Sequence, residues 1–166
     1  MTEQSVNPIT LDAVDLRLLA LLQIDASLAN QELAQRAHVS PATCLRRVRR
    51  LTELGVVRRR VALLDADRLG PSIQVICEVT LDRQGAEHVE AFERVATAHP
   101  AVRQCYRVSP GPDVVLLAVA RDMPAWTAVV AGLFTQHANV RNVKTFFVLR
   151  CSKFETAVPL PGLPQA

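Results

Sequence analysis

The chain has 166 residues, of which 49% are apolar and 21% are charged, a composition typical of a folded globular protein and not of an extended disordered one. No apolar run approaches the roughly eighteen residues that a membrane-spanning helix needs, and the N-terminus lacks a basic start followed by an apolar stretch, so we expect a cytoplasmic protein without a membrane partner. The four cysteines lie far apart without a CxxC pair, which argues against a zinc or thioredoxin-type site. We therefore expect no metal and no cofactor.

Positive charge is concentrated in one short segment. Seven of the 19 basic residues are arginines between Arg46 and Arg60, where Glu53 is the single acid. The rest of the chain is slightly acidic in sum, and such an asymmetry indicates that one part of the molecule meets a polyanion. Nucleic acid is the polyanion that we expect.

Two helices are predicted in the N-terminal part of the chain. Leucines at helical spacing predict the first over residues 11–23, which Thr10 or Asp12 can cap. The second is predicted over residues 30–37, and Asn30 is the residue available to cap it. Their apolar faces need a partner, which the next segment supplies.

A third helix has the clearest start in the sequence. Ser40 can cap the backbone amides, Pro41 takes the first helical position where no amide hydrogen is missed, and Gly55 can close the helix in a left-handed conformation. At 100° per residue this helix is amphipathic with a basic outer face. The apolar side carries Cys44, Leu45, Val48, Leu51 and Leu54, and the opposite side carries Arg46, Arg49, Arg50 and Glu53, with Arg47 on the shoulder between them.

Two helices joined by a short turn, the second basic and exposed at its start, are typical of a helix-turn-helix. Outward arginines suit the major groove, where arginine pairs with guanine or neutralises phosphate, and the alternative is a solvated helix face. Residues 56–64 then read as a strand, either a wing or a connecting strand. The predicted DNA-binding residues are Ser40, Pro41, Ala42, Thr43, Arg46, Arg47, Arg49, Arg50, Arg58 and Arg60.

Beyond a hinge at residues 65–71 the pattern changes to alternating strands and helices. The order βαββαβ is the ferredoxin-like arrangement, an antiparallel four-stranded sheet with both helices on one face, and the other face must be covered. Strands are predicted over residues 73–81, 102–108, 114–120 and 143–150, and helices over residues 86–98 and from Asp122 to about His137.

Two motifs in the first third of the chain have a specific spacing. They are Leu11-Asp12-x-x-Asp15-x-x-Leu18-Leu19 and Ser40-Pro41-x-x-Cys44-Leu45-x-Arg47-Val48-x-x-Leu51-x-x-x-Gly55-Val56-Val57. With them the chain resembles the leucine-responsive regulator and asparagine-activator family, Lrp/AsnC, over residues 11–156. The resemblance implies a transcription regulator and not an enzyme, with a C-terminal ligand domain that dimerises through its sheet and often forms octamers. It also implies an amino acid effector bound where neighbouring dimers meet.

The predicted effector loop departs from the family pattern. The family generally has Gly-Asp-x-Asp after Val-Ser or Val-Thr, whereas Val108-Ser109 is followed here by Pro110-Gly111-Pro112-Asp113. The two prolines remove two backbone donors that would hold a ligand carboxylate. Asp113 remains to receive an ammonium group, with Ser109 and the Gly111 amide as further contacts. The alternative is a rigid turn that binds no ligand.

The sequence thus predicts an α+β protein of two domains. Residues 1–56 form a winged-helix-like helix-turn-helix domain, residues 57–71 a linker strand and hinge, residues 72–157 a ferredoxin-like effector-binding and oligomerisation domain, and residues 158–166 an extended tail. We expect a nucleoid-associated regulator of amino acid metabolism genes that binds double-stranded DNA as a homodimer or octamer and answers to an amino acid. The alternatives are an architectural DNA-binding protein without an effector and an enzyme similar to the sirohaem decarboxylases.

Overall fold

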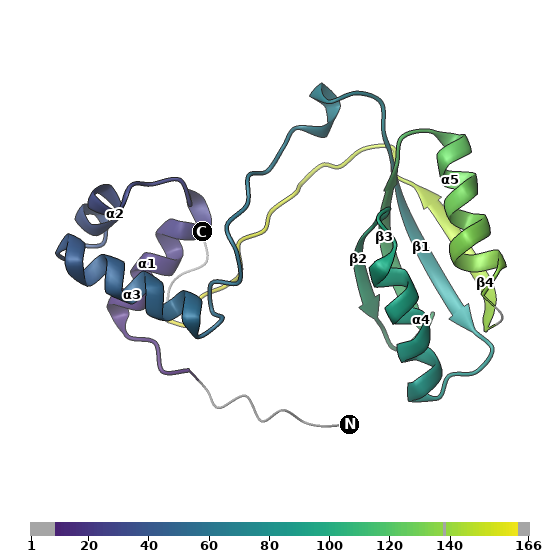
Figure 1. The fold of residues 1–166 in the computed structure, drawn as a ribbon, viewed down its shortest axis with the longest axis horizontal. Helices are drawn as coiled ribbons and strands as arrows, with labels where there is room; N and C mark the ends of the chain where they lie inside the picture. Colours follow the sequence, from purple (N-terminus) through teal and green to yellow (C-terminus); the bar gives the residue numbers. More distant parts are fainter. Residues whose placement is uncertain (1–8, 138, 163–166) are drawn as a thin grey trace. The chain divides into compact units, whose positions relative to one another are not determined.

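The computed structural model describes residues 9–137 and 139–162. Contacts divide the chain into two units: a helical unit that runs to Leu63 and includes the chain from Lys153 onward, and a sheet unit from Leu64 to Ser152. Three helices precede a four-stranded sheet with its helices, which confirms the predicted α+β class (Figure 1). None of the helices in the described residues is long and apolar enough to cross a membrane.

The helical unit contains α1 (Ala13–Ile24), α2 (Asn30–Arg36) and α3 (Pro41–Glu53) (Figure 1). A capping box starts α1: the Asp12 carboxylate accepts the Asp15 amide at 2.9 Å, and the Asp15 carboxylate accepts the Asp12 amide at 3.3 Å. Each carboxylate therefore satisfies a backbone donor that the helix leaves without an intrahelical partner.

The predicted start and end of α3 are confirmed. The Ser40 hydroxyl accepts the Thr43 amide at 3.3 Å, and Pro41 stands in the first turn. Gly55 follows the helix with φ +72°, a conformation that glycine adopts without a steric penalty. These three residues fix where the basic helix begins and ends.

The buried face of α3 is narrower than predicted. Cys44, Val48 and Leu51 are buried, whereas Leu45 is 62% and Leu54 is 44% exposed, so the inward placement of these two leucines was wrong. Helical spacing gives the direction of a side chain but not the width of the surface that covers it. Among the described elements, α2 and α1 make the main contacts with α3, and they cover a single stripe along it.

The predicted cap of α2 was also wrong. Ala29 holds the capping position without a side-chain hydrogen bond, and the Asn30 side-chain amide instead donates to the Pro41 carbonyl at 2.9 Å. At the C-terminal end of α2, the Arg17 side chain of α1 donates to the Ala37 carbonyl at 3.2 Å. Asn30 thus joins the starts of the two helices of the helix-turn-helix instead of closing one of them.

Residues 56–64 do not form the predicted strand. A strand needs a neighbour to accept and donate backbone hydrogen bonds, and no described segment pairs with this one. Its arginines therefore lie on an irregular connector, and the hinge that follows contains the 3-10 turn η1 (Ala66–Arg68).

The sheet unit has the predicted βαββαβ order with strands arranged β2-β3-β1-β4, all neighbours antiparallel (Figure 1). Cys77 lies opposite Leu116 of β3 and Thr145 of β4, which sets β1 in the centre. Its elements are β1 (Ile73–Leu81), α4 (Ala86–Ala98), β2 (Val102–Arg107), β3 (Val114–Ala120), α5 (Met123–Val130), the π-helical turn η2 (Ala131–Thr135) and β4 (Val140–Phe147).

The core of the sheet unit lies between one sheet face and the helices. Alternate residues of β1 and β3 are buried, as the period-2 pattern predicts, and Phe92 of α4 and Trp126 of α5 pack against them. The last strand begins earlier than predicted, because Val140 already pairs with Leu81 across an irregularity in β1. The helix predicted to reach His137 ends at Val130 and continues as η2.

Candidate nucleic-acid interface and ligand loop

The first turn of α3 presents the small residues predicted to meet base edges. Ser40, Pro41 and Ala42 are exposed and Thr43 is half-buried. The Ser40 hydroxyl also donates to the Thr43 hydroxyl at 2.9 Å, so these two polar groups are held in place before any ligand arrives. Side chains of this size allow the start of the helix to approach a groove closely.

The arginines of α3 fall into two classes that the sequence did not separate. Arg46 is exposed, and no carboxylate in residues 9–137 or 139–162 pairs with it. Arg49 is 80% exposed and pairs with Glu53 at 2.8 Å, a contact open to solvent on both sides. Both of these side chains can reach phosphate, because a solvent-exposed ion pair is worth little and opens readily.

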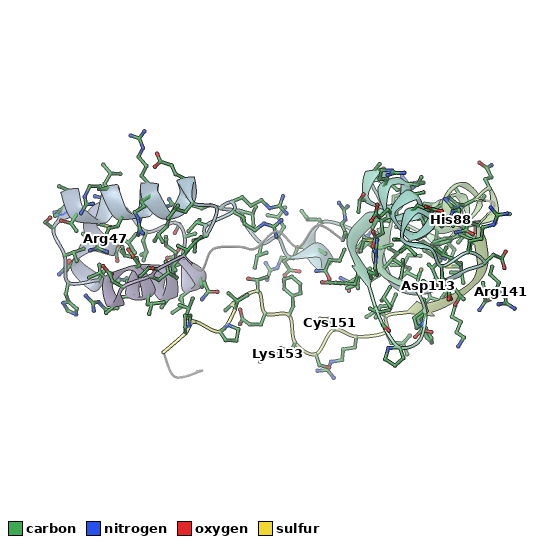
Figure 2. The ribbon with its side chains drawn as sticks, turned by 90° about the horizontal axis from the view of Figure 1, so that it is seen from below. Arg47, His88, Asp113, Arg141, Cys151 and Lys153 are labelled. Carbon is green, nitrogen blue, oxygen red and sulfur yellow. The ribbon has the colours of Figure 1, made fainter. Side chains whose placement is uncertain are left out.

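Arg47, which is labelled in Figure 2, contacts the start of α1, and so does Arg50. The Arg47 Nη1 bridges the Asp12 carboxylate at 2.6 Å and the Asp15 carboxylate at 2.9 Å, and the Arg50 Nη1 pairs with Asp15 at 3.1 Å. The side chain of Asp15 is 2% exposed. These contacts hold the pKa of Asp12 below its usual value, first through the Asp15 amide and then through Arg47, and they raise the pKa of Arg47.

A hollow of about 300 Å³ opens beside this cluster. Arg46, Arg47 and Arg50 line it together with Thr10, Asp12 and Asp15. The sequence could not reveal this arrangement, because Asp15 and Arg47 lie 32 positions apart and no local spacing joins them. Of the predicted DNA-binding arginines, α3 therefore presents Arg46 and Arg49 outward and turns Arg47 inward.

The arginines that follow α3 are exposed along the connector. Arg58, Arg59 and Arg60 have no carboxylate partner within the part of the chain that the structure describes. Burial raises the pKa of Cys44, and the positive charge of Arg60 partly opposes this rise. The connector thus adds cationic side chains close to the recognition helix without a wing.

The loop between β2 and β3 is fastened to the end of β1. The carboxylate of Asp113, which is labelled in Figure 2, accepts the Leu81 amide at 2.7 Å and the Gln84 side chain at 3.3 Å. The Asp113 amide donates to the Val79 carbonyl at 2.9 Å. Gly111, with φ +125°, shapes the turn, and Ser109 is exposed. The acid predicted to receive an ammonium group therefore already has two hydrogen-bond donors.

A second hollow, of about 200 Å³, lies beside this loop on the sheet face away from the helices. Glu78 and Thr80 of β1 and Asn142 and Lys144 of β4 line it, and Gly111 and Pro112 complete its wall. Glu78 and Lys144 stand opposite each other in the strand register, 3.9 Å apart. The hollow thus presents one carboxylate and one ammonium group, which only the pairing of β1 with β4 brings beside the loop.

Among the described residues, no group of three or more histidine, cysteine, aspartate or glutamate side chains is placed to hold a metal ion. Cys77 is buried, and burial raises its pKa to about 11. His137 packs edge-on against Phe92, with ring centroids 5.3 Å apart.

Comparisons with known proteins agree with this geometry. Residues 11–52 match the AsnC-type helix-turn-helix domain, and residues 74–158 match the Lrp/AsnC ligand binding domain. The chain is 37% identical over 142 residues to the leucine-responsive regulatory protein of Rhizobium meliloti, covering 86% of this chain and 91% of that relative. It is 32% identical over 150 residues to the Bkd operon transcriptional regulator of Pseudomonas aeruginosa, covering 90% and 98% of the two chains.

Solved structures give the same result. A transcriptional regulator from Neisseria meningitidis in complex with L-Met superposes with a TM-score of 0.83 at 32% identity, covering 92% of this chain and 98% of that one. An AsnC family transcriptional regulator from Agrobacterium tumefaciens gives 0.82 at 31% identity, covering 90% and 97%. These relatives are regulators and not enzymes, which excludes the alternative of a sirohaem decarboxylase. The chain belongs to the Lrp/AsnC family of DNA-binding transcriptional regulators with a ligand-binding domain.

Proposed function

We propose that this chain binds specific sites in double-stranded DNA as a homodimer or octamer, in the cytoplasm and on the nucleoid, and that it regulates genes of amino acid metabolism in response to an amino acid. The observation that carries the proposal is the start of α3, where small exposed residues precede the outward arginines. In a dimer, two such helices would read half-sites about one helical turn of DNA apart.

The open face of the sheet supports self-association. Tyr106 and Phe146 are both 49% exposed there, and the side chains of Ile76 and Leu117 are only partly covered. Apolar side chains gathered on one exposed face mark a surface that a partner covers. A second copy of the same sheet is the partner that we propose.

The hollow beside the β2–β3 loop supports an amino acid effector. Lys144 offers a positive group for a ligand carboxylate, and Glu78 offers a carboxylate for a ligand ammonium group. Ser109, Gly111 and Asp113 would position the loop or contact the ligand when neighbouring chains close over it. A related regulator crystallised with L-Met, and another relative is named for leucine, so an amino acid is the class that we propose.

The test is binding of the purified protein to its own upstream DNA and to scrambled DNA of equal length, with and without pooled amino acids. We expect a preference for the natural DNA that shifts when the pool is added, and splitting the pool then names the effector. Preference without a shift would contradict the effector, and would favour the rigid Pro110–Pro112 turn. Equal binding to both DNAs would favour an architectural protein, which the exposed Arg58–Arg60 run is also suited to serve.

A further inference from the structure

The ion cluster between α1 and α3 joins the two helices at one buried carboxylate. Asp15 is the single polar residue among the buried side chains of the described chain, and its two carboxylate oxygens contact Arg47 and Arg50 separately. The same carboxylate accepts the Asp12 amide and so helps to start α1. One side chain therefore fixes the start of the first helix and the inner edge of the recognition helix.

The Arg47 side chain is directed into this ion cluster and not toward a DNA groove. Its side chain is 21% exposed, its Nη1 bridges two carboxylates, and its Nε is buried with no hydrogen-bond partner in the described structure. The single Nη1 atom serves both acids because it carries two N–H donors whose directions are set by the planar guanidinium, whereas a lysine ammonium rotates freely and sits on a more flexible stem. Moving Arg47 to a phosphate would leave the buried Asp15 with one cation fewer, and a buried charge without its partner is costly.

Arg50 completes the arrangement from the next turn of α3. Its Nη1 pairs with Asp15, and its Nη2 donates to the Thr10 carbonyl at 3.4 Å. Arg46, by contrast, lines the hollow and is exposed. Two cations of the helix thus pair with carboxylates of α1, Arg47 at 21% and Arg50 at 44% side-chain exposure, while Arg46 has no carboxylate partner among the described residues.

We propose that Asp15 is a positioning residue for DNA recognition: it holds Arg47 and Arg50 away from the DNA backbone and sets the angle of α3 for base readout. This inference rests on the proposed sequence-specific binding. Non-specific affinity grows with the number of cations that reach phosphate, whereas discrimination depends on where the helix lies in the groove. Asp15 therefore lowers the non-specific affinity for DNA and raises the discrimination between sequences.

The test is Asp15→Asn in the full chain, assayed on upstream and scrambled DNA over a range of salt concentrations. Because Arg47 keeps its pair with Asp12, the variant frees one arginine per subunit, Arg50, and the slope of log K against log salt should become about 2 more negative per dimer on scrambled DNA. The preference for upstream DNA should fall by about tenfold, the worth of one well-placed base contact. Partial unfolding would not produce a gain in salt-dependent affinity.

The matched control is Glu32→Gln, which removes the same charge from an exposed pair with Arg36 on α2. It should leave both the slope and the preference at their original values. Equal effects of the two variants would overturn the proposal, because the change would then reflect net charge alone. If the unaltered protein shows no preference between the DNAs, the proposed function fails, while the slope on scrambled DNA still tests the role of Asp15.

A second variant, Arg47→Lys, keeps the charge and replaces the planar guanidinium, whose Nη1 bridges the two carboxylates, with a more flexible ammonium, so it tests the proposal if Asp15→Asn does not fold. We expect the preference for upstream DNA to fall by several-fold while the salt slope stays near its original value. A lysine variant with full preference would contradict the positioning role, since a phosphate contact accepts either cation.

Discussion

The helical unit and the sheet unit are stabilised in different ways. Fifteen buried residues form the core of the sheet unit, whereas the main cluster of the helical unit has six, two of them alanines. The helical unit adds a buried carboxylate with two arginines, and no such cluster is found in the described part of the sheet unit. Charge in the helical unit therefore serves folding as well as the recognition that we propose, while the sheet unit depends on packing.

The largest effect is expected in the core of the sheet unit. Phe92 of α4 is fully buried against the sheet, so Phe92→Ala should lower the free energy of unfolding of this unit by about 3–5 kcal/mol. Hydrogen exchange on peptides from β1 and β3 would measure the loss. Equal loss of protection in α1 and α3 would contradict separate cores.

The helical unit should respond to a cavity of its own. Leu18 of α1 is fully buried between α2 and α3, and Leu18→Ala should lower the free energy of unfolding of this unit by about 2–5 kcal/mol. Exchange in α1 and α3 should accelerate while β1 keeps its protection. Unchanged exchange in α3 would show that the ion cluster, and not the small core, holds the three helices.

The turn between α2 and α3 tests how tightly the recognition helix is set. His38 has φ +57°, a left-handed conformation that β-branched residues tolerate poorly. His38→Val should lower the free energy of unfolding by about 1–2 kcal/mol, while His38→Gly should not lower it. Thermal unfolding followed by circular dichroism would measure both, and equal effects would contradict a backbone origin.

Acid should act more on capped helix starts than on the sheet core. The pKa of Asp12 lies below the usual 3.8 because of the Asp15 amide and Arg47, and that of Asp122 because of the Ala125 amide and Arg121. This stabilisation is complete above pH 3.8 and is lost as the pH falls through the lowered pKa values.

Asp12→Asn retains a capping group without the titration. We expect the melting temperature of this variant to fall less than that of the unaltered protein between about pH 4 and about pH 2, the range in which carboxylates titrate. The effect is small because the carboxylates of Asp12 and Asp122 are both exposed to solvent. An unaltered acid profile in the variant would show that other carboxylates control acid unfolding.

Local signals in the sequence predicted most of the fold. The Ser40-Pro41 start, the Gly55 end and the alternation along β1 each arise within a few residues, and the structure places them as expected. The strand over residues 56–64 failed because a strand exists only where a neighbour pairs with it, and sequence pattern does not supply the neighbour.

The division among the arginines could not be predicted for a similar reason. Helical geometry placed Arg47 on the shoulder of α3, but its partners Asp12 and Asp15 come from α1 across the fold. Likewise, Glu78 and Lys144 meet only through the register of two strands far apart in the chain. Contacts of this kind depend on tertiary packing, which residue spacing does not encode.

The C-terminal residues show the same dependence on tertiary contact. Val158 was expected in an extended tail, and its amide donates to the Gln23 side chain at 2.6 Å while its carbonyl accepts from it at 3.2 Å. Gln23 therefore holds the returning chain against α1. The last four residues, 163–166, lie outside the described structure.

The most direct test of the account is hydrogen exchange on the full chain, measured with upstream DNA and separately with pooled amino acids. DNA should slow exchange in α3 and in the connector up to Arg60, and the amino acids should slow exchange in the loop from Val108 to Asp113. Protection by DNA confined to β1–β4, with α3 unchanged, would contradict the assignment of DNA binding to the helical unit.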